Sequence, residues 1–305
     1  MRAFVAIVDE GSLSAAAQAL DRAPPTMVRT LATLEEALGV RLLTRTTRRM
    51  SLTEEGRVYL DRCRRILSDV EEAEEAVLAR DTKPRGEIRA TAPLLFGQLH
   101  VAPALAAFAK RHPRVRADLL LLDRVVDLVE EGIDVGVRIA HLADSSMIAV
   151  PVGEVRRVTV ASPELLARTG LPQHPSELAS HPCVGHHGGS PASRWSFDGG
   201  GKPVDVRVHC AFATNLAAAA VDACAAGVGF GNFLSYQVEP QVRDGRLRLI
   251  LEDHAPPGIP VQIVYPDARL MSPRLRIFVD WLREHLRGRP EIQRRRHGDD
   301  LSSGV

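Results

Sequence analysis

The sequence lacks long apolar runs. No stretch among its 305 residues approaches the roughly 18 consecutive apolar residues that a membrane-spanning helix needs. The first residues also lack the charged-then-apolar pattern of an export signal. We therefore expect a cytoplasmic protein that has no membrane partner.

Cysteine is also scarce. Its four copies, Cys63, Cys183, Cys210 and Cys224, show no CxxC spacing and fit a reducing compartment better than a disulfide framework. A zinc or copper hypothesis arises because imidazole and thiolate groups gather in one region, but alternate strand residues point to opposite faces and no known ligand spacing is matched. We interpret these residues as core and loop residues and expect no metal and no cofactor. They are His181, Cys183, His186, His187, His209 and Cys210.

The usual motifs of enzymes are missing. The chain has no GxSxG, Walker loop, HExxH or GxGxxG after a strand. The glycine-rich run 227–231 is better explained by a helix C-cap followed by tight entry into a strand, and the three glycines at 199–201 by a hairpin turn. We expect a protein that is not an enzyme.

Positive charge is not in excess over the whole chain, whose net charge is +1. Phosphate binding would need a local basic patch instead. Residues 22–65 supply one, with ten Arg against five acidic residues. Four of these Arg lie within residues 41–49, where they alternate with Thr, so guanidinium and hydroxyl donors can both reach phosphate oxygens. The alternative for such a run is a solvated charged loop.

The residues around this patch favour a DNA-binding fold. Helical patterns over 14–20 and 26–38 flank a turn at 21–25, and the basic loop 39–51 follows, which is the order of a winged helix-turn-helix. Met27, Leu31, Leu34 and Leu38 recur at helical spacing and would face the core, so polar side chains occupy the opposite face. The predicted DNA-binding residues are Ser14, Pro25, Thr26, Arg29, Thr30, Arg45, Arg48 and Arg49.

A long helix is predicted after the basic loop. Thr53 can cap it, and Glu54 and Glu55 suit the positive end of its dipole. An apolar stripe then repeats at spacings of four and three, which is typical of a coiled-coil seam. The alternative is an amphipathic helix that lies on its own domain, and we favour a linker helix that forms a dimer. The stripe consists of Tyr59, Cys63, Ile66, Val70, Ala73 and Val77.

Beyond Gly86 strands and helices alternate, which indicates α/β sheets covered by helices. Predicted strands are 87–91, 115–122, 133–139, 157–161, 183–186, 204–210, 228–232 and 261–265. Predicted helices are 99–111, 124–131, 163–168, 215–226 and 273–287.

Four separated segments resemble the LysR-type transcriptional regulators. They are GSLSAAAQAL at 11–20, LEEALGVRLLTRTTRRMSLTEEG at 34–56, APLLFG at 92–97 and DRVVDLVEEGIDVGVRI at 123–139, the last similar to the branch with a DRxVDLVxEGxD signature. The resemblance extends from Met1 to about Arg287. It implies an α/β protein overall, with a winged helix-turn-helix at 1–52, a linker helix and hinge at 53–86 and a periplasmic-binding-protein-like effector domain. Subdomain I of that domain would comprise 87–160 and 261–288, and subdomain II 161–260, followed by a polar tail at 289–305.

Ligands of open α/β sheets bind where the strands end and helix N-termini present free N–H groups. At such positions Thr214 and Asn215 suit either a ligand or the N-cap of the next helix, and Arg138 suits either a carboxylate ligand or a structural ion pair. The predicted effector-binding residues are Pro93, Leu94, Phe96, Gly97, Arg138, Ile139, Thr214, Asn215 and Asn232.

These patterns together predict a sequence-specific transcriptional regulator. Its partners would be double-stranded promoter DNA, a small-molecule effector such as a carboxylate, further copies of itself in a homodimer or homotetramer, and RNA polymerase if it activates transcription. The alternative is a solute-binding or carrier protein with the same effector fold. That alternative leaves the first 80 residues unexplained and would require export.

Overall fold

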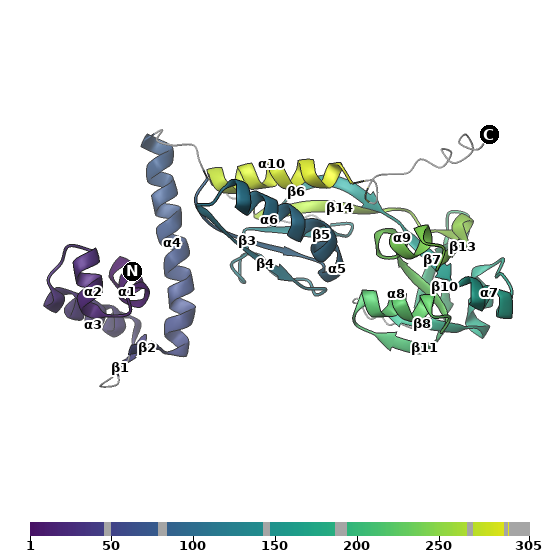
Figure 1. Ribbon diagram of the computed structural model, residues 1–305, viewed down its shortest axis with the longest axis horizontal. Coiled ribbons are helices and arrows are strands. Elements are labelled where there is room, and N and C mark those ends of the chain that lie inside the picture. The colour runs from purple at the N-terminus through teal and green to yellow at the C-terminus, as the bar shows by residue number, and fades with distance from the viewer. Residues whose placement is uncertain are drawn as a thin grey trace. The chain divides into compact units, whose positions relative to one another are not determined.

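The computed structural model describes residues 1–45, 50–78, 84–142, 147–186, 194–266, 271–289 and 292. The chain forms two compact units, Met1–Glu87 and Ile88–Val305, and each is considered by itself (Figure 1).

The first unit has the predicted order of a winged helix-turn-helix. Phe4, Ile7, Met27 and Leu31 are fully buried and form its core together with small residues of the second helix. Leu38, which we expected in this core, is 40% exposed because it is the last helical residue before the Gly39 C-cap. The elements are α1 (Arg2–Asp9), α2 (Leu13–Ala19), α3 (Pro24–Leu38), β1 (Leu43–Arg45), β2 (Met50–Leu52) and α4 (Glu54–Leu78).

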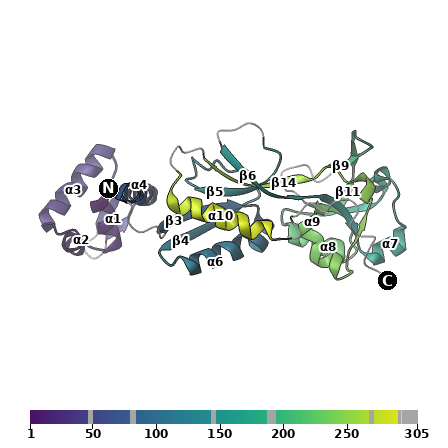
Figure 2. The same cartoon turned by 90° about the horizontal axis from the view of Figure 1, so that it is seen from above.

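The second unit begins with a five-stranded sheet in the order β4-β3-β5-β14-β6. Helices α6 and α10 pack on this sheet (Figures 1 and 2). They contribute Phe108 and Phe278, whose rings meet edge to face at 5.1 Å. A short helix and a single π-helical turn, Gly97–Val101, lead directly into α6. The elements are β3 (Gly86–Ala92), α5 (Leu94–Phe96), α6 (Ala102–Arg111), β4 (Val115–Leu121), β5 (Val135–Ile139), β6 (Met147–Val155), β14 (Ile259–Pro266) and α10 (Pro273–Arg287).

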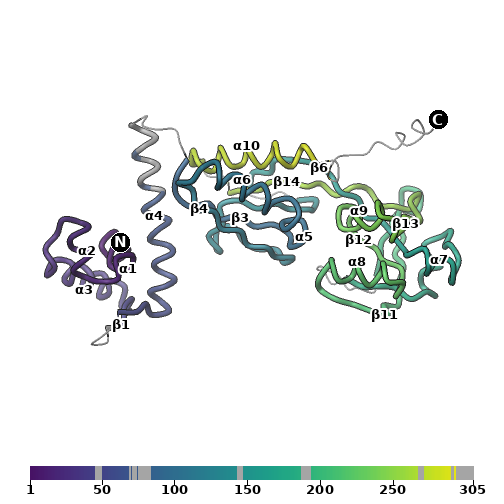
Figure 3. Tube along the Cα trace, viewed as in Figure 1, coloured from purple at the N-terminus to yellow at the C-terminus, as the bar shows by residue number. Residues whose placement is uncertain are grey.

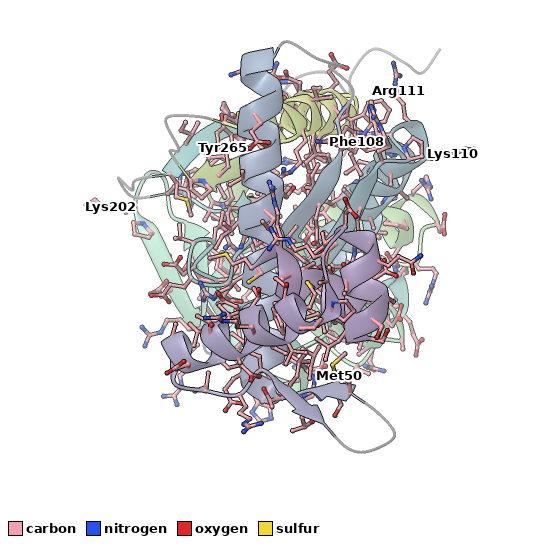
Figure 4. All side chains as sticks on the ribbon, turned by 90° about the vertical axis from the view of Figure 1, so that its left-hand side faces the viewer. Met50, Phe108, Lys110, Arg111, Lys202 and Tyr265 are labelled. Carbon is pink, nitrogen blue, oxygen red and sulfur yellow. The ribbon has the colours of Figure 1, made fainter. Side chains whose placement is uncertain are left out.

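A second five-stranded sheet has the order β11-β8-β12-β7-β13. The chain passes between the two sheets twice, from β6 to β7 and from β13 to β14 (Figure 3). The β9–β10 hairpin, with Lys202 in its turn (Figure 4), packs on one face of this sheet and α8 on the other. The elements are β7 (Arg157–Ala161), α7 (Pro163–Thr169), β8 (Pro182–His186), β9 (Arg194–Asp198), β10 (Pro203–Arg207), β11 (His209–Thr214), α8 (Ala217–Ala225), β12 (Phe230–Leu234), α9 (Ser235–Arg243) and β13 (Arg248–Ile250).

The predicted alternation of strands and helices is confirmed for most elements, but the helix expected at 124–131 is wrong. Asp127 Oδ1 accepts hydrogen bonds from the backbone N–H groups of Val129 (2.9 Å) and Glu130 (3.0 Å), and these bonds compete with helical ones. Arg124 and Glu131 then close the segment with two bonds of 2.7 and 2.9 Å. The segment is therefore a compact loop.

Three other boundaries differ from the prediction. The strand expected at 204–210 is divided between β10, which turns back on β9, and β11, which pairs with β8. Strand β7, whose residues 157–160 we assigned to the first subdomain, pairs with β12 in the second sheet. Ile292, expected in a polar tail, is completely buried in the core of the first sheet.

Candidate functional site

The outward face of α3 carries polar side chains on a well-packed helix. Thr26 and Arg29 are exposed, whereas Met27 between them is fully buried. Thr30 is partly buried, and its hydroxyl donates to the Thr26 carbonyl at 2.8 Å. Pro25 occupies the first turn of α3 and is exposed, as is Ser14 on α2. This face can therefore approach a groove without disturbing the core.

Glu35 holds the basic loop against α3. Its carboxylate oxygen accepts hydrogen bonds from the backbone N–H groups of Leu42 (2.8 Å) and Leu43 (3.1 Å) at the start of β1. The β1–β2 hairpin forms the predicted wing, with Met50 at the start of β2 (Figure 4). Arg45 lies in β1, but its side chain, like all of Arg48 and Arg49, lies outside the described residues.

The junction between the wing and α4 is fixed by Thr53. Its hydroxyl donates to the Arg41 carbonyl at 2.7 Å and accepts from the Gly56 N–H at 2.9 Å, so Thr53 is the predicted N-cap. Glycine is required at position 56, because a Cβ there would lie 2.0 Å from the Leu42 carbonyl oxygen. The wing and the long helix are thus joined rigidly.

The apolar stripe on α4 has two parts. Tyr59 and Cys63 pack into the core of their own unit, where burial raises the pKa of both groups. Ile66 and Val70, one and two turns further on, are 45% and 40% exposed. The side chains of Ala73 and Val77 lie outside the described residues.

Two of the predicted effector residues in the first subdomain are buried. Phe96 is fully buried, and its ring meets that of Tyr236 from α9 edge to face at 5.2 Å. Gly97 is also buried, and glycine is required there because a Cβ would lie 2.1 Å from a methyl carbon of Leu121. Pro93, Leu94 and Ile139 are partly exposed and can form an apolar wall.

The polar side chains near the strand ends of the first subdomain already have hydrogen-bond partners. Asp123 Oδ1 accepts a hydrogen bond from the Leu94 N–H at 2.9 Å, which occupies the start of α5. Arg138 donates to the Val126 carbonyl at 2.9 Å and so holds the loop that precedes β5. Burial lowers the pKa of Arg138, and the charge of Glu131 opposes that shift.

The second subdomain presents polar groups that are less engaged. Thr214 Oγ1 accepts from the Leu216 N–H at 3.2 Å, and Asn215 is exposed. Helix α8 starts directly afterwards, with Leu216 as its N-cap, whose side chain makes no capping hydrogen bond. The N–H groups of its first turn can therefore donate hydrogen bonds to an anion.

Asn232 of β12 belongs to a cluster of polar side chains that also includes Arg157 and Thr159 of β7. Its amide nitrogen donates to Thr159 Oγ1 at 3.2 Å, and its amide oxygen accepts from Arg157 Nη1 at 3.3 Å. It is only 8% exposed. Asn232 is thus fixed inside the second subdomain.

Two of the cysteines of this subdomain, Cys183 and Cys224, are buried thiols, whereas Cys210 is partly exposed. Burial raises the pKa of Cys183 and Cys224 to about 12, so both stay protonated at neutral pH. Within the described ranges no three His, Cys, Asp or Glu side chains are placed to hold a metal ion, and His187 lies outside those ranges. No helix in the described part of the chain is long and apolar enough to span a membrane.

Family models match both units. Residues 1–57 match the bacterial regulatory helix-turn-helix of the lysR family, and residues 81–287 match the LysR substrate binding domain. The chain belongs to the LysR family of transcriptional regulators. It is therefore a DNA-binding regulator with an effector-binding domain, and the alternative of a carrier protein is not supported.

Relatives along almost the whole chain agree with this assignment. An HTH-type transcriptional repressor of Pseudomonas aeruginosa is 34% identical over 295 residues, which cover 96% of this chain and 93% of the relative. The regulator CrgA of Neisseria meningitidis is 34% identical, with 93% and 95% covered. Its solved structure superposes with a TM-score of 0.60 over 93% of this chain and 97% of that one, at 33% identity. The full-length virulence activator AphB of Vibrio cholerae gives 0.58 at 26% identity, with 92% and 96% covered.

Sequence reasoning missed Glu35, Asp123 and Tyr236. The two acidic residues belong to the motifs that resemble the family, but no contact was predicted for either, although each accepts a backbone N–H that joins two elements. Tyr236 lies on α9, a helix of the second subdomain that we did not predict, and it packs into the core of the first subdomain. Side-chain periodicity carries no signal for such contacts between distant segments.

Proposed function

We propose that this LysR-type regulator binds promoter DNA through α3 and the β1–β2 wing. Thr26 and Arg29 would contact base edges, while Arg45, Arg48 and Arg49 would contact phosphates. The observation that carries this proposal is the division of α3 into a buried face and an exposed polar face, on a helix that Glu35 ties to the wing. Ser14, Pro25 and Thr30 would line the same surface.

The effector that we propose is a small carboxylate. The N–H groups at the start of α8, with Thr214 and Asn215, supply the polar contacts, and Pro93, Leu94 and Ile139 supply an apolar wall. Arg138 has a structural hydrogen bond to Val126, and we assign it to the loop rather than to the ligand. Phe96, Gly97 and Asn232 support this cleft from behind.

We further propose that the regulator acts in the cytoplasm as a homodimer or homotetramer. Ile66 and Val70 are exposed on α4, and burying them against a second copy would remove apolar surface from water. An effector that binds two arrangements of the oligomer unequally would shift the population between them on DNA. RNA polymerase would be a further partner if the regulator activates transcription.

DNA binding is tested with single Arg substitutions. Arg29→Ala should weaken binding to the operator by about tenfold or more, since a bidentate base contact contributes roughly 1–3 kcal/mol. Arg48→Ala should weaken binding to operator and random duplex alike and should reduce the salt dependence. The measurement is affinity for both duplexes over a salt series. Arg248→Ala, at an exposed residue of β13 outside the basic patch, is the control, and equal losses in Arg29→Ala and this control would contradict the assignment.

Assembly is tested with Ile66→Glu. A carboxylate in a closed apolar seam would be desolvated, so this variant should be monomeric and bind DNA poorly. Light scattering of the full chain measures the change. Val58→Glu is the matched control, because Val58 is 55% exposed but lies outside the stripe. A monomeric wild type, or equal dissociation of both variants, would refute the role of α4.

A further inference from the structure

A charged side chain lies at the point where the chain enters the second subdomain. Arg157 is the first residue of β7, and its side chain is on the same face of the sheet as those of Thr159 and Asn232. Among the residues that the structure describes, its guanidinium makes one hydrogen bond, to the Asn232 amide oxygen at 3.3 Å, and no ion pair. Burial lowers the pKa of this guanidinium, with no opposing effect from a nearby carboxylate.

This guanidinium contributes to a small pocket. Its polar lining includes Arg156, Arg157, Thr159 and Glu252, and its apolar lining includes Phe197, Ile250 and Leu251. Leu251 has a φ of 54°, a conformation that is unfavourable for a residue with a branched side chain and is found at ligand-binding positions. The pocket thus combines a cation that lacks a counter-ion with apolar walls and a strained backbone.

No acidic residue in the part of the chain that the structure describes forms an ion pair with this cation. Glu252 also lines the pocket, but it is exposed and makes no ion pair within the described ranges. The connection from β8 to β9, residues 187–193, contains no acidic residue in its sequence. Arg138, the comparable partly buried Arg of the first subdomain, has the charge of Glu131 nearby. A partly buried cation without such a partner is costly, and an anion from solution would remove that cost.

We propose that the Arg157 pocket binds a small monocarboxylate. A guanidinium and a carboxylate match as two parallel hydrogen bonds, and the Thr159 hydroxyl could donate a third. Phe197 and Ile250 would contact a short apolar body, and the limited room excludes a large one. This site is separate from the proposed effector cleft, because every residue that lines it belongs to the second subdomain or to the crossings next to it.

The position of the pocket gives such a ligand a regulatory role. Arg156 and Arg157 form the first crossing between the sheets, and Leu251 to Pro256 lie on the second. An anion on Arg157 would contact both crossings at once. It would therefore stabilise one relative position of the two subdomains, independently of the cleft.

The test is the melting temperature of the full chain with sodium acetate, propionate or isobutyrate, at constant ionic strength against sodium chloride. At ten times the dissociation constant, the wild type should melt roughly 3–6 °C higher. Arg157→Met should abolish this rise, whereas Arg248→Met, which removes an exposed charge from the neighbouring β13, should retain it. The variant with both Thr214→Val and Asn215→Leu should also retain it, which separates this pocket from the effector cleft.

A second variant covers the case in which Arg157→Met does not fold. Asn232→Asp places an internal carboxylate next to Arg157, so the ligand-free protein should melt higher and the response to carboxylates should disappear. An undiminished response in Asn232→Asp or Arg157→Met would overturn the proposal. So would complete loss of the response in the Thr214 and Asn215 double variant, because the binding would then belong to the effector cleft.

Discussion

The two subdomains of the effector unit treat the polar groups at their strand ends in opposite ways. In the first, Asp123 accepts the Leu94 N–H at 2.9 Å and Arg138 donates to a loop carbonyl at 2.9 Å. In the second, the Leu216 N-cap of α8 provides no side-chain capping hydrogen bond to the first turn of the helix, and Asn215 beside it is exposed. Asp123 and Arg138 of the first subdomain therefore have internal partners, whereas Asn215 and the first turn of α8 in the second remain accessible.

This difference assigns separate tasks to the two sides of the cleft. A group that already has a partner gains little from a ligand, since binding only exchanges one hydrogen bond for another. A helix N-terminus that is exposed to water offers N–H groups and a favourable dipole to an anion. We therefore expect polar recognition of the effector to come from the second subdomain, and apolar contact to come from the first.

The largest effect should follow from changes in the second subdomain. Replacing Thr214 with Val and Asn215 with Leu together should weaken carboxylate effector binding about tenfold or more, because both polar side chains next to α8 are lost while the helix itself remains. Calorimetric titration of the full chain with a carboxylate found by a thermal-shift screen provides the measurement.

Arg138→Met is the matched test in the first subdomain. Since Arg138 bonds to the Val126 carbonyl, its loss should lower the melting temperature slightly and leave effector affinity within about twofold. If Arg138→Met weakens binding as much as the double variant does, both subdomains recognise the anion and the comparison fails.

The sequence predicted the elements that depend on local periodicity. Helix α10 spans the predicted 273–287, and β7 spans the predicted 157–161. Apolar residues at helical spacing also identified the buried face of α3, through Met27 and Leu31. These predictions succeeded because each element buries one face and exposes another, so its pattern is independent of distant residues.

The failures share a different cause. Residues 124–131 have helical periodicity, but the Asp127 side chain bonds to the backbone N–H groups that a helix would use. Phe96 and Gly97 were predicted to line the cleft, yet both are buried by contacts with Tyr236 and Leu121, which come from distant parts of the chain. Such tertiary contacts decide whether a residue near a strand end faces a ligand or the core, and the periodicity of a single sequence does not reveal them.

A smaller effect than that of the double variant should come from Asp123, and it sharpens the comparison most directly. Asp123→Ala leaves the Leu94 N–H without its acceptor and should cost about 1 kcal/mol, as other losses of helix caps do. For a unit of this size the melting temperature should fall by roughly 2–4 °C. Asp123→Asn keeps an oxygen acceptor and should lose about half as much or less. The freed N–H and the lost negative charge should also increase carboxylate affinity, by up to about threefold, since the first subdomain would then resemble the second. Weaker binding in Asp123→Ala would instead mean that Asp123 positions the ligand, and that the first subdomain takes part in polar recognition.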